Sequence, residues 1–142
     1  MVKYSAIIPI LVGDKYDNII LIHKLKPKHK IGLLDIPGGP VLNKQLPSYA
    51  AIGYLMSETG IGSDYLCSNM LSVGVQVSAN NEWSIDFFTA LIDIEINEIR
   101  KKNHSGESIL ILDVNDALNH GALWSDLRHI IPIALDKLNS FT

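Results

Sequence analysis

Residues 34–61, LDIPGGPVLNKQLPSYAAIGYLMSETGI, contain the signals that decide the fold of this chain. The segment opens with a short apolar stretch that predicts a strand and leads into Pro37, Gly38 and Gly39. Paired glycines permit positive φ angles and allow other groups to approach the backbone closely, so a glycine turn is expected here. A polar loop then separates this turn from a helix.

The second half of the segment predicts one amphipathic helix over residues 49–59. Ser48 stands in front of it as the expected N-cap, and Gly60 follows it as the expected left-handed stop. Ala51 and Leu55 are spaced so that they share one face of the helix. We expect these two side chains to be buried.

This arrangement resembles the Nudix box of the Nudix hydrolase family, G-x5-E-x7-R-E-U-x-E-E-x-G-U, in which U is a bulky aliphatic residue. The register needs no gaps, and the matching residues are Gly39, Leu55, Glu58, Gly60 and Ile61. The resemblance implies an α/β (α+β) fold, namely a Nudix-like α/β/α sandwich with a central mixed β-sheet. It is strongest at residues 34–61 and extends, by element order, over a single domain of residues 1–142.

Most residues that carry the chemistry of the box are replaced. Where the family has glutamate, arginine, glutamate and glutamate, this chain has Gln45, Gly53, Tyr54 and Ser57. In active members of the family the helix glutamates hold Mg²⁺ or Mn²⁺ against a pyrophosphate. Mg²⁺ demands near-octahedral oxygen coordination, and Glu58 is the one box carboxylate that remains. We therefore expect Glu58 to be catalytic if the chain is active, and to be a weak Mg²⁺ ligand.

The favoured interpretation is a protein that binds a nucleotide or a nucleoside-diphosphate derivative, with hydrolysis weak or lost. The residues expected to contact such a ligand are Gly38, Gly39, Tyr54, Ser57 and Asp86. Tyr54 could stack on a nucleobase or fill the volume of a lost metal site. Asp86 interrupts an apolar strand and could face the cleft.

Two alternatives stay open. In the first, the chain is an active Mg²⁺-dependent pyrophosphohydrolase, in which a metal polarises the phosphates and positions a water. Its metal site would combine Glu58 with acids outside the box, and the candidates are Asp86, Asp93, Glu95, Glu98 and Glu107. In the second alternative, the chain is a protein-interaction scaffold in which Tyr54 and Ser57 close the pocket.

A run of alternating lysines lies just before the glycine turn. It consists of Lys24, Lys26, Lys28 and Lys30, interleaved with His23 and His29. The simpler interpretation is a solvated edge. The alternative is a rim that faces phosphates, since lysine ammonium groups bind phosphate as point charges.

Composition limits the class of protein. The chain has 142 residues, of which 47% are apolar and 19% are charged, so it can bury a sizeable core. Its formal net charge of −3 argues against bulk binding of nucleic acid, and no apolar run is long enough to span a membrane. The single cysteine, Cys67, suits a reducing compartment, so a cytoplasmic location is expected. A homodimer is compatible with the resemblance, because family members often dimerise.

The remaining elements follow from hydrophobic periodicity. Strands are predicted over residues 3–12, 19–26, 71–78, 83–93 and 108–112, with a helical turn over 114–119 and a terminal helix over 125–140. The polar segment 97–106 is predicted to be an exposed loop. Pro132 is expected to kink the terminal helix or to restart it.

Overall fold

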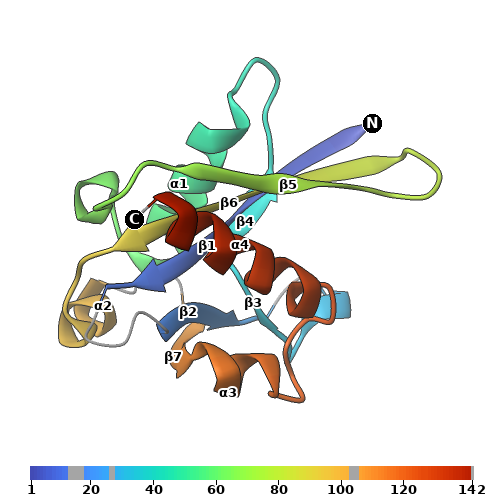
Figure 1. The fold of residues 1–142 in the computed structure, drawn as a ribbon. Coiled ribbons are helices and arrows are strands. Elements are labelled where there is room, and N and C mark those ends of the chain that lie inside the picture. Colours follow the sequence, from blue (N-terminus) through green and yellow to red (C-terminus); the bar gives the residue numbers. More distant parts are fainter. Residues whose placement is uncertain (13–17, 26–27, 103–105, 142) are drawn as a thin grey trace.

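The computed structural model describes residues 1–12, 18–25, 28–102 and 106–141. A mixed sheet forms the centre of the fold and helices cover both of its faces, with α4 crossing one face and α1 packed on the other (Figure 1). The strands are β1 (Val2–Leu11), β2 (Asn18–His23), β3 (Leu34–Asp35), β4 (Gly38–Pro40), β5 (Leu71–Val77), β6 (Trp83–Ile92) and β7 (Ser108–Asp113). The helices are α1 (Pro47–Thr59), α2 (Ile96–Lys102), α3 (Val114–Leu118) and α4 (Leu127–Phe141), with short 3-10 turns at Lys28–Lys30 and Ser63–Tyr65. This is the predicted α/β/α sandwich.

Strand β1 is the centre of the sheet and is buried on both faces. It runs parallel to β6 over its whole length, whereas its other described pairings are antiparallel. Ile7 and Leu11 belong to the core under α1, and Ile8 and Ile10 belong to the core under α4. A strand covered on both faces needs apolar side chains in consecutive positions, which explains the run Ala6–Leu11.

The sheet divides beside β1, and this division positions the candidate site. Among the described residues, β1 pairs with β2 at Ile10 and Leu11. Farther toward its start, β1 pairs instead with β4, through Tyr4 to Ala6. Strand β2 continues separately, with β3 on one side and β7 on the other. Because β3 leads within two residues into β4, the end of β2 and the start of β4 lie close together at this division.

Helix α1 confirms most of the predicted helix and corrects its start. Pro47 lies in the first turn, where its fixed φ and its missing N–H cost nothing. Leu46 occupies the N-cap position without a side-chain cap, so the expectation that Ser48 caps the helix is wrong. Gly60 adopts φ 79° and donates its N–H to the carbonyl of Met56, which is the expected left-handed stop.

Three other expectations need correction. Residues 38–40 form strand β4 against β1 and not a free glycine turn. The segment predicted as an exposed loop contains α2, because Ile99 is fully buried in the core under α1 and anchors a helical turn. Helix α4 runs continuously through Pro132, so a restart does not occur there. Within the described part of the chain, no helix is long and apolar enough to cross a membrane.

The packing of α1 gives a direct test of the fold. Leu55 is fully buried, so we expect Leu55→Ala to lower the free energy of unfolding by roughly 2–5 kcal/mol. Met56, the next residue, is 54% exposed, so Met56→Ala should change stability by less than about 0.5 kcal/mol. Urea denaturation of both variants measures the difference. Equal effects would show that the buried face of α1 is assigned wrongly.

Candidate functional site

A buried cluster of three charged side chains lies at the division of the sheet. The ammonium of Lys24 is 2.9 Å from Glu58 Oε1 and 3.7 Å from Glu107 Oε1. The three side chains are between 7% and 15% exposed. The cluster brings together the one remaining box carboxylate, a carboxylate from outside the box and a lysine.

The fold places each member of the cluster by simple geometry. Glu58 lies in the last turn of α1. His23 pairs with Ser108 in the β2·β7 ladder, so the next residues outward, Lys24 and Glu107, are direct neighbours across the extended pair. Side chains alternate between the faces of a strand, and the buried Ile20 of the α1-side core fixes which face Lys24 shares. All three side chains therefore meet on the α1 side of the sheet.

Backbone N–H groups take up the second oxygen of each carboxylate. Gly38 donates to Glu58 Oε2 at 2.9 Å, and Leu25 donates to Glu107 Oε2 at 2.7 Å. The contact with Glu58 occurs where the chain is tightly packed, because a Cβ at Gly38 would lie 2.7 Å from the carbonyl oxygen of Ser5. Each carboxylate thus divides its oxygens between the ammonium and the backbone.

The cluster holds two carboxylates and one ammonium, and the pKa values of Glu58 and Lys24 are both raised. Burial raises the pKa of Glu58, and the attraction of Lys24 and the Gly38 N–H offsets this only in part, while the charge of Glu107 adds to the rise. Burial acts to lower the pKa of Lys24, but the hydrogen bond and charge of Glu58 and the charges of Glu107 and Asp35 outweigh it. The pKa of the lysine is therefore raised, because one ammonium is shared by more than one carboxylate.

The rest of the lysine run corrects the expectation of a solvated or phosphate-facing rim. Lys30 binds Asp35 Oδ2 at 2.8 Å, and its ammonium lies 4.1 Å from the ring centroid of Trp124. Lys24 is buried, and only Lys28 among the described lysines of the run is exposed. Lys26 lies outside the described residues.

Tyr54 covers the glycine strand β4. A Cβ at Gly39 would lie 2.5 Å from Tyr54 Cζ, so the ring covers the position directly. The hydroxyl donates to the carbonyl oxygen of Pro40 at 2.6 Å. Burial, and then the charge of Glu58, raise the pKa of this hydroxyl, so it stays protonated as a donor.

The other replaced box positions have local structural contacts. Gln45 accepts a hydrogen bond from the N–H of Leu42 at 3.1 Å, within the loop before α1. Ser57 is exposed, and its hydroxyl donates to the carbonyl oxygen of Tyr54 at 3.3 Å. A Cβ at Gly53 would meet nothing within 4 Å, so close packing does not explain this glycine.

The structure brings one of the outside acids to Glu58 and leaves the others elsewhere. Glu107 is buried beside Lys24. Asp86 is half-buried on β6, where it pairs with Ser5, and the start of α1 lies over that row because Ser5 donates to the carbonyl oxygen of Pro47. Asp93, Glu95 and Glu98 are exposed.

A divalent metal does not fit the cluster as it stands. Among the described residues, no group of three or more His, Cys, Asp or Glu side chains is arranged to hold a metal ion. The position between Glu58 and Glu107 is taken by the Lys24 ammonium. A second positive charge beside this ammonium would be repelled at short range.

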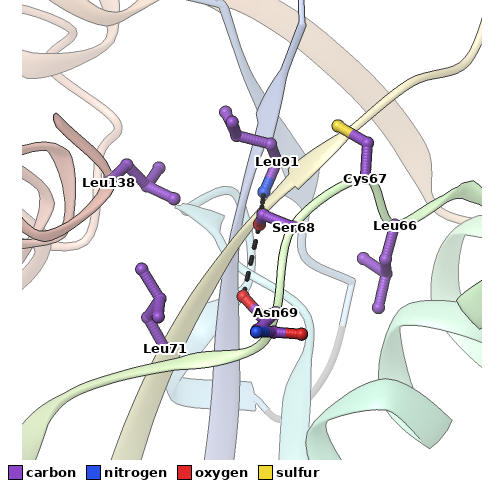
Figure 2. A pocket seen from close by; sticks show the side chains of 7 residues that line it. All are labelled: Leu66, Cys67, Ser68, Asn69, Leu71, Leu91 and Leu138. Carbon is purple, nitrogen blue, oxygen red and sulfur yellow. Dashed lines mark hydrogen bonds between the residues drawn. The ribbon is translucent and has the colours of Figure 1, made fainter. Parts of the chain in front are cut away.

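A hollow in the described surface lies elsewhere (Figure 2). It measures about 520 Å³ and is lined by Leu66, Cys67, Ser68, Asn69, Leu71, Leu91 and Leu138. The Ser68 hydroxyl in it is already bonded, accepting from the N–H of Leu91 and donating to the carbonyl oxygen of Asn69. None of its lining residues is acidic or basic, so it has no charged group for phosphate or metal.

Comparison with solved structures identifies the fold. A MutT/Nudix family protein from Listeria innocua matches 98% of this chain and 94% of its own, with a TM-score of 0.73 and 20% identity. The Ap4A hydrolase of C. elegans matches 97% of this chain and 98% of its own, with a TM-score of 0.73 and 14% identity. The NUDIX domain of Shewanella oneidensis NrtR, solved with ADP ribose, matches 97% of this chain and 88% of its own, with a TM-score of 0.70 and 14% identity.

These similarities confirm the predicted resemblance at the level of the fold. No family model matches the chain, and no curated protein matches it in sequence. At such low identity the shared feature is the Nudix fold itself, and the residues of the site must be argued from this structure.

Two glycines of the box should respond in opposite ways to alanine. Gly53→Ala should raise the free energy of unfolding by about 1 kcal/mol, because alanine favours helix and the space is open. Gly39→Ala should lower it by about 1 kcal/mol, because the Tyr54 ring must move and lose its hydrogen bond to Pro40. Denaturation midpoints measure both effects. The cost at Gly39 should shrink in a Tyr54→Ala background, and an unchanged cost would contradict the assigned contact.

Proposed function

We propose that this Nudix-fold chain binds a nucleotide or a nucleoside-diphosphate derivative and that its hydrolytic activity is weak or lost. The observation that carries the proposal is the engagement of Glu58. Its two oxygens are bonded to Lys24 and to the N–H of Gly38. The box carboxylate that would hold a metal against a pyrophosphate is therefore already neutralised by the protein.

The argument about hydrolysis rests on what the reaction needs. Pyrophosphate hydrolysis in a metal-dependent enzyme uses the metal to polarise a phosphate and to generate the attacking nucleophile. This chain supplies Glu58 within the box, and Gln45, Tyr54 and Ser57 lack carboxylates at the remaining positions. These features support weak Mg²⁺ binding, in roughly the millimolar range, by the free protein.

The class of ligand is proposed from the fold and from the remaining polar groups. The NrtR domain with this fold was solved with ADP ribose, and the C. elegans neighbour is an Ap4A hydrolase. In this chain the half-buried ring of Tyr54 offers an apolar face for a base, and Ser57 offers an exposed hydroxyl nearby. The carboxylate of Asp86 accepts hydrogen bonds, which suits ribose hydroxyls rather than phosphates. Gly38 and Gly39 contribute shape, because Glu58 and Tyr54 cover them.

One observation favours the active alternative. Glu107 lies beside the same ammonium as Glu58, so two carboxylates are within reach of a common cation. A ligand that carries its own metal could use both carboxylates if it displaced Lys24. The chain would then be a Mg²⁺-dependent pyrophosphohydrolase with a rebuilt site.

Binding and turnover of the unmodified protein separate the two functions. Titration calorimetry with ADP-ribose, Ap4A and nucleoside triphosphates should detect binding of at least one of them. Phosphate-release or product assays with Mg²⁺ or Mn²⁺ should show turnover near background, because the box carboxylate is paired with Lys24. Absence of binding across the panel would contradict the proposed ligand class.

Glu58→Gln assigns any turnover that is found, with Glu95→Gln as a matched change at an exposed acid. Strong metal-dependent turnover that Glu58→Gln abolishes and Glu95→Gln preserves would establish the active alternative. Turnover that both variants preserve would move the catalytic centre away from α1, and Asp86 and Glu107 would be the next acids to replace.

A further inference from the structure

A buried lysine between two buried carboxylates is expensive to maintain. Removing charges from water costs several kcal/mol per ion, and the cost is recovered only where geometry is good and the remaining polar atoms are satisfied. The cluster has such geometry, since three of the four carboxylate oxygens of Glu58 and Glu107 are hydrogen-bonded to the ammonium or a backbone N–H, and the fourth lies 3.7 Å from the ammonium. Such an arrangement needs an explanation beyond a surface ion pair.

The two carboxylates are oriented as they would be around a shared cation. Each turns one oxygen to the Lys24 ammonium and fixes the other with a backbone N–H, from Gly38 or Leu25. They come from separate parts of the chain, the end of α1 and the residue before β7. Without a positive charge between them, these two buried carboxylates would repel each other.

We propose that the Lys24 ammonium is a built-in cation, which occupies the position where a divalent cation would otherwise bind between Glu58 and Glu107. The ammonium thereby holds the two carboxylates in place without metal, and its removal leaves a divalent-cation site made of the two carboxylates. The inference goes beyond the proposed function, because it concerns only the cation and its carboxylates and holds for any ligand.

The dimensions of the cluster support this exchange. An ammonium donates up to three hydrogen bonds and accepts none, and Lys24 uses its positive charge on two acidic neighbours at 2.9 and 3.7 Å. Mg²⁺ and Ca²⁺ bind carboxylate oxygens at shorter distances of roughly 2.0–2.6 Å. A metal ion therefore fits between these carboxylates only after the ammonium has left.

The test uses Mn²⁺ alone, with binding measured by the loss of its free electron paramagnetic resonance signal. Lys24→Met removes the charge while keeping an unbranched side chain, and we expect Mn²⁺ affinity to rise at least about tenfold over the unmodified protein. Lys24→Arg keeps the positive charge and should show no gain. Lys28→Met makes the same change in net charge at an exposed lysine and should also show no gain.

Second substitutions show whether both carboxylates form the new site. The gain in Lys24→Met should disappear when Glu107→Gln or Glu58→Gln is added. A gain that survives either addition would place the metal elsewhere and overturn the proposal. A folded Lys24→Met protein without increased Mn²⁺ affinity would overturn it as well, and so would unmodified protein that binds Mn²⁺ as tightly as the variant.

A measurement on the unmodified protein covers the case in which Lys24→Met does not fold. If Mn²⁺ restores folding of that variant, the metal replaces the ammonium as proposed. If the variant stays unfolded, amide signals of Gly38 and Leu25 in the unmodified protein decide the question by nuclear magnetic resonance. Selective broadening of these signals by micromolar Mn²⁺ would overturn the proposal, whereas unbroadened signals support an occupied cation position.

Discussion

The hydrogen bonds and ion pair of Glu58 join the end of helix α1 to two parts of the sheet at once. One oxygen ties the end of α1 to β4 through the N–H of Gly38, and the other ties it to the end of β2 through Lys24. These strands pair with different ends of β1, and β3, just before β4 in the chain, pairs with β2. At this place a polar contact holds the helix against the sheet, as apolar packing does elsewhere in the fold. It also explains why a charged residue is retained at a helix C-terminus, where the helix dipole disfavours it.

The apolar part of the fold could be predicted from the sequence because its signals are local. The period of α1 identifies Leu55 as buried, and Gly60 marks the end of the helix because an αL residue is needed there. The errors arise where local signals compete. Ser48 is a good N-cap by residue type, but the helix begins two residues earlier than predicted, at Pro47. Helix α2 was missed because Ile99, which anchors it in the core, stands within a polar segment.

The cluster was harder to predict, because it depends on strand register between distant parts of the chain. In sequence, Lys24 belongs to a row of alternating lysines that suggests solvent exposure. Glu107 is one acid among several. In the structure it accepts a hydrogen bond from the N–H of Leu25, 82 positions away, and no local pattern in the sequence indicates this pairing. One signal was present, since Ile20, Ile22 and Lys24 alternate along β2 and therefore share a face. That alternation places the lysine on the α1 side of the sheet, although it cannot identify its partners.

The replaced box residues and the buried lysine form one electrostatic arrangement. With glutamates at positions 45, 54 and 57, as the family pattern has them, the site would collect several negative charges that one ammonium could not balance. Gln45, Tyr54 and Ser57 remove those charges, and the carboxylates that remain at the cluster are Glu58 and Glu107. Three of their four oxygens are hydrogen-bonded to the ammonium or to a backbone N–H, and the fourth lies 3.7 Å from the ammonium. The neutral Tyr54 and the Lys24–Glu58 ion pair are therefore best understood together, because the charge of Glu58 already raises the pKa of the Tyr54 hydroxyl and a glutamate at position 54 would add a further negative charge there.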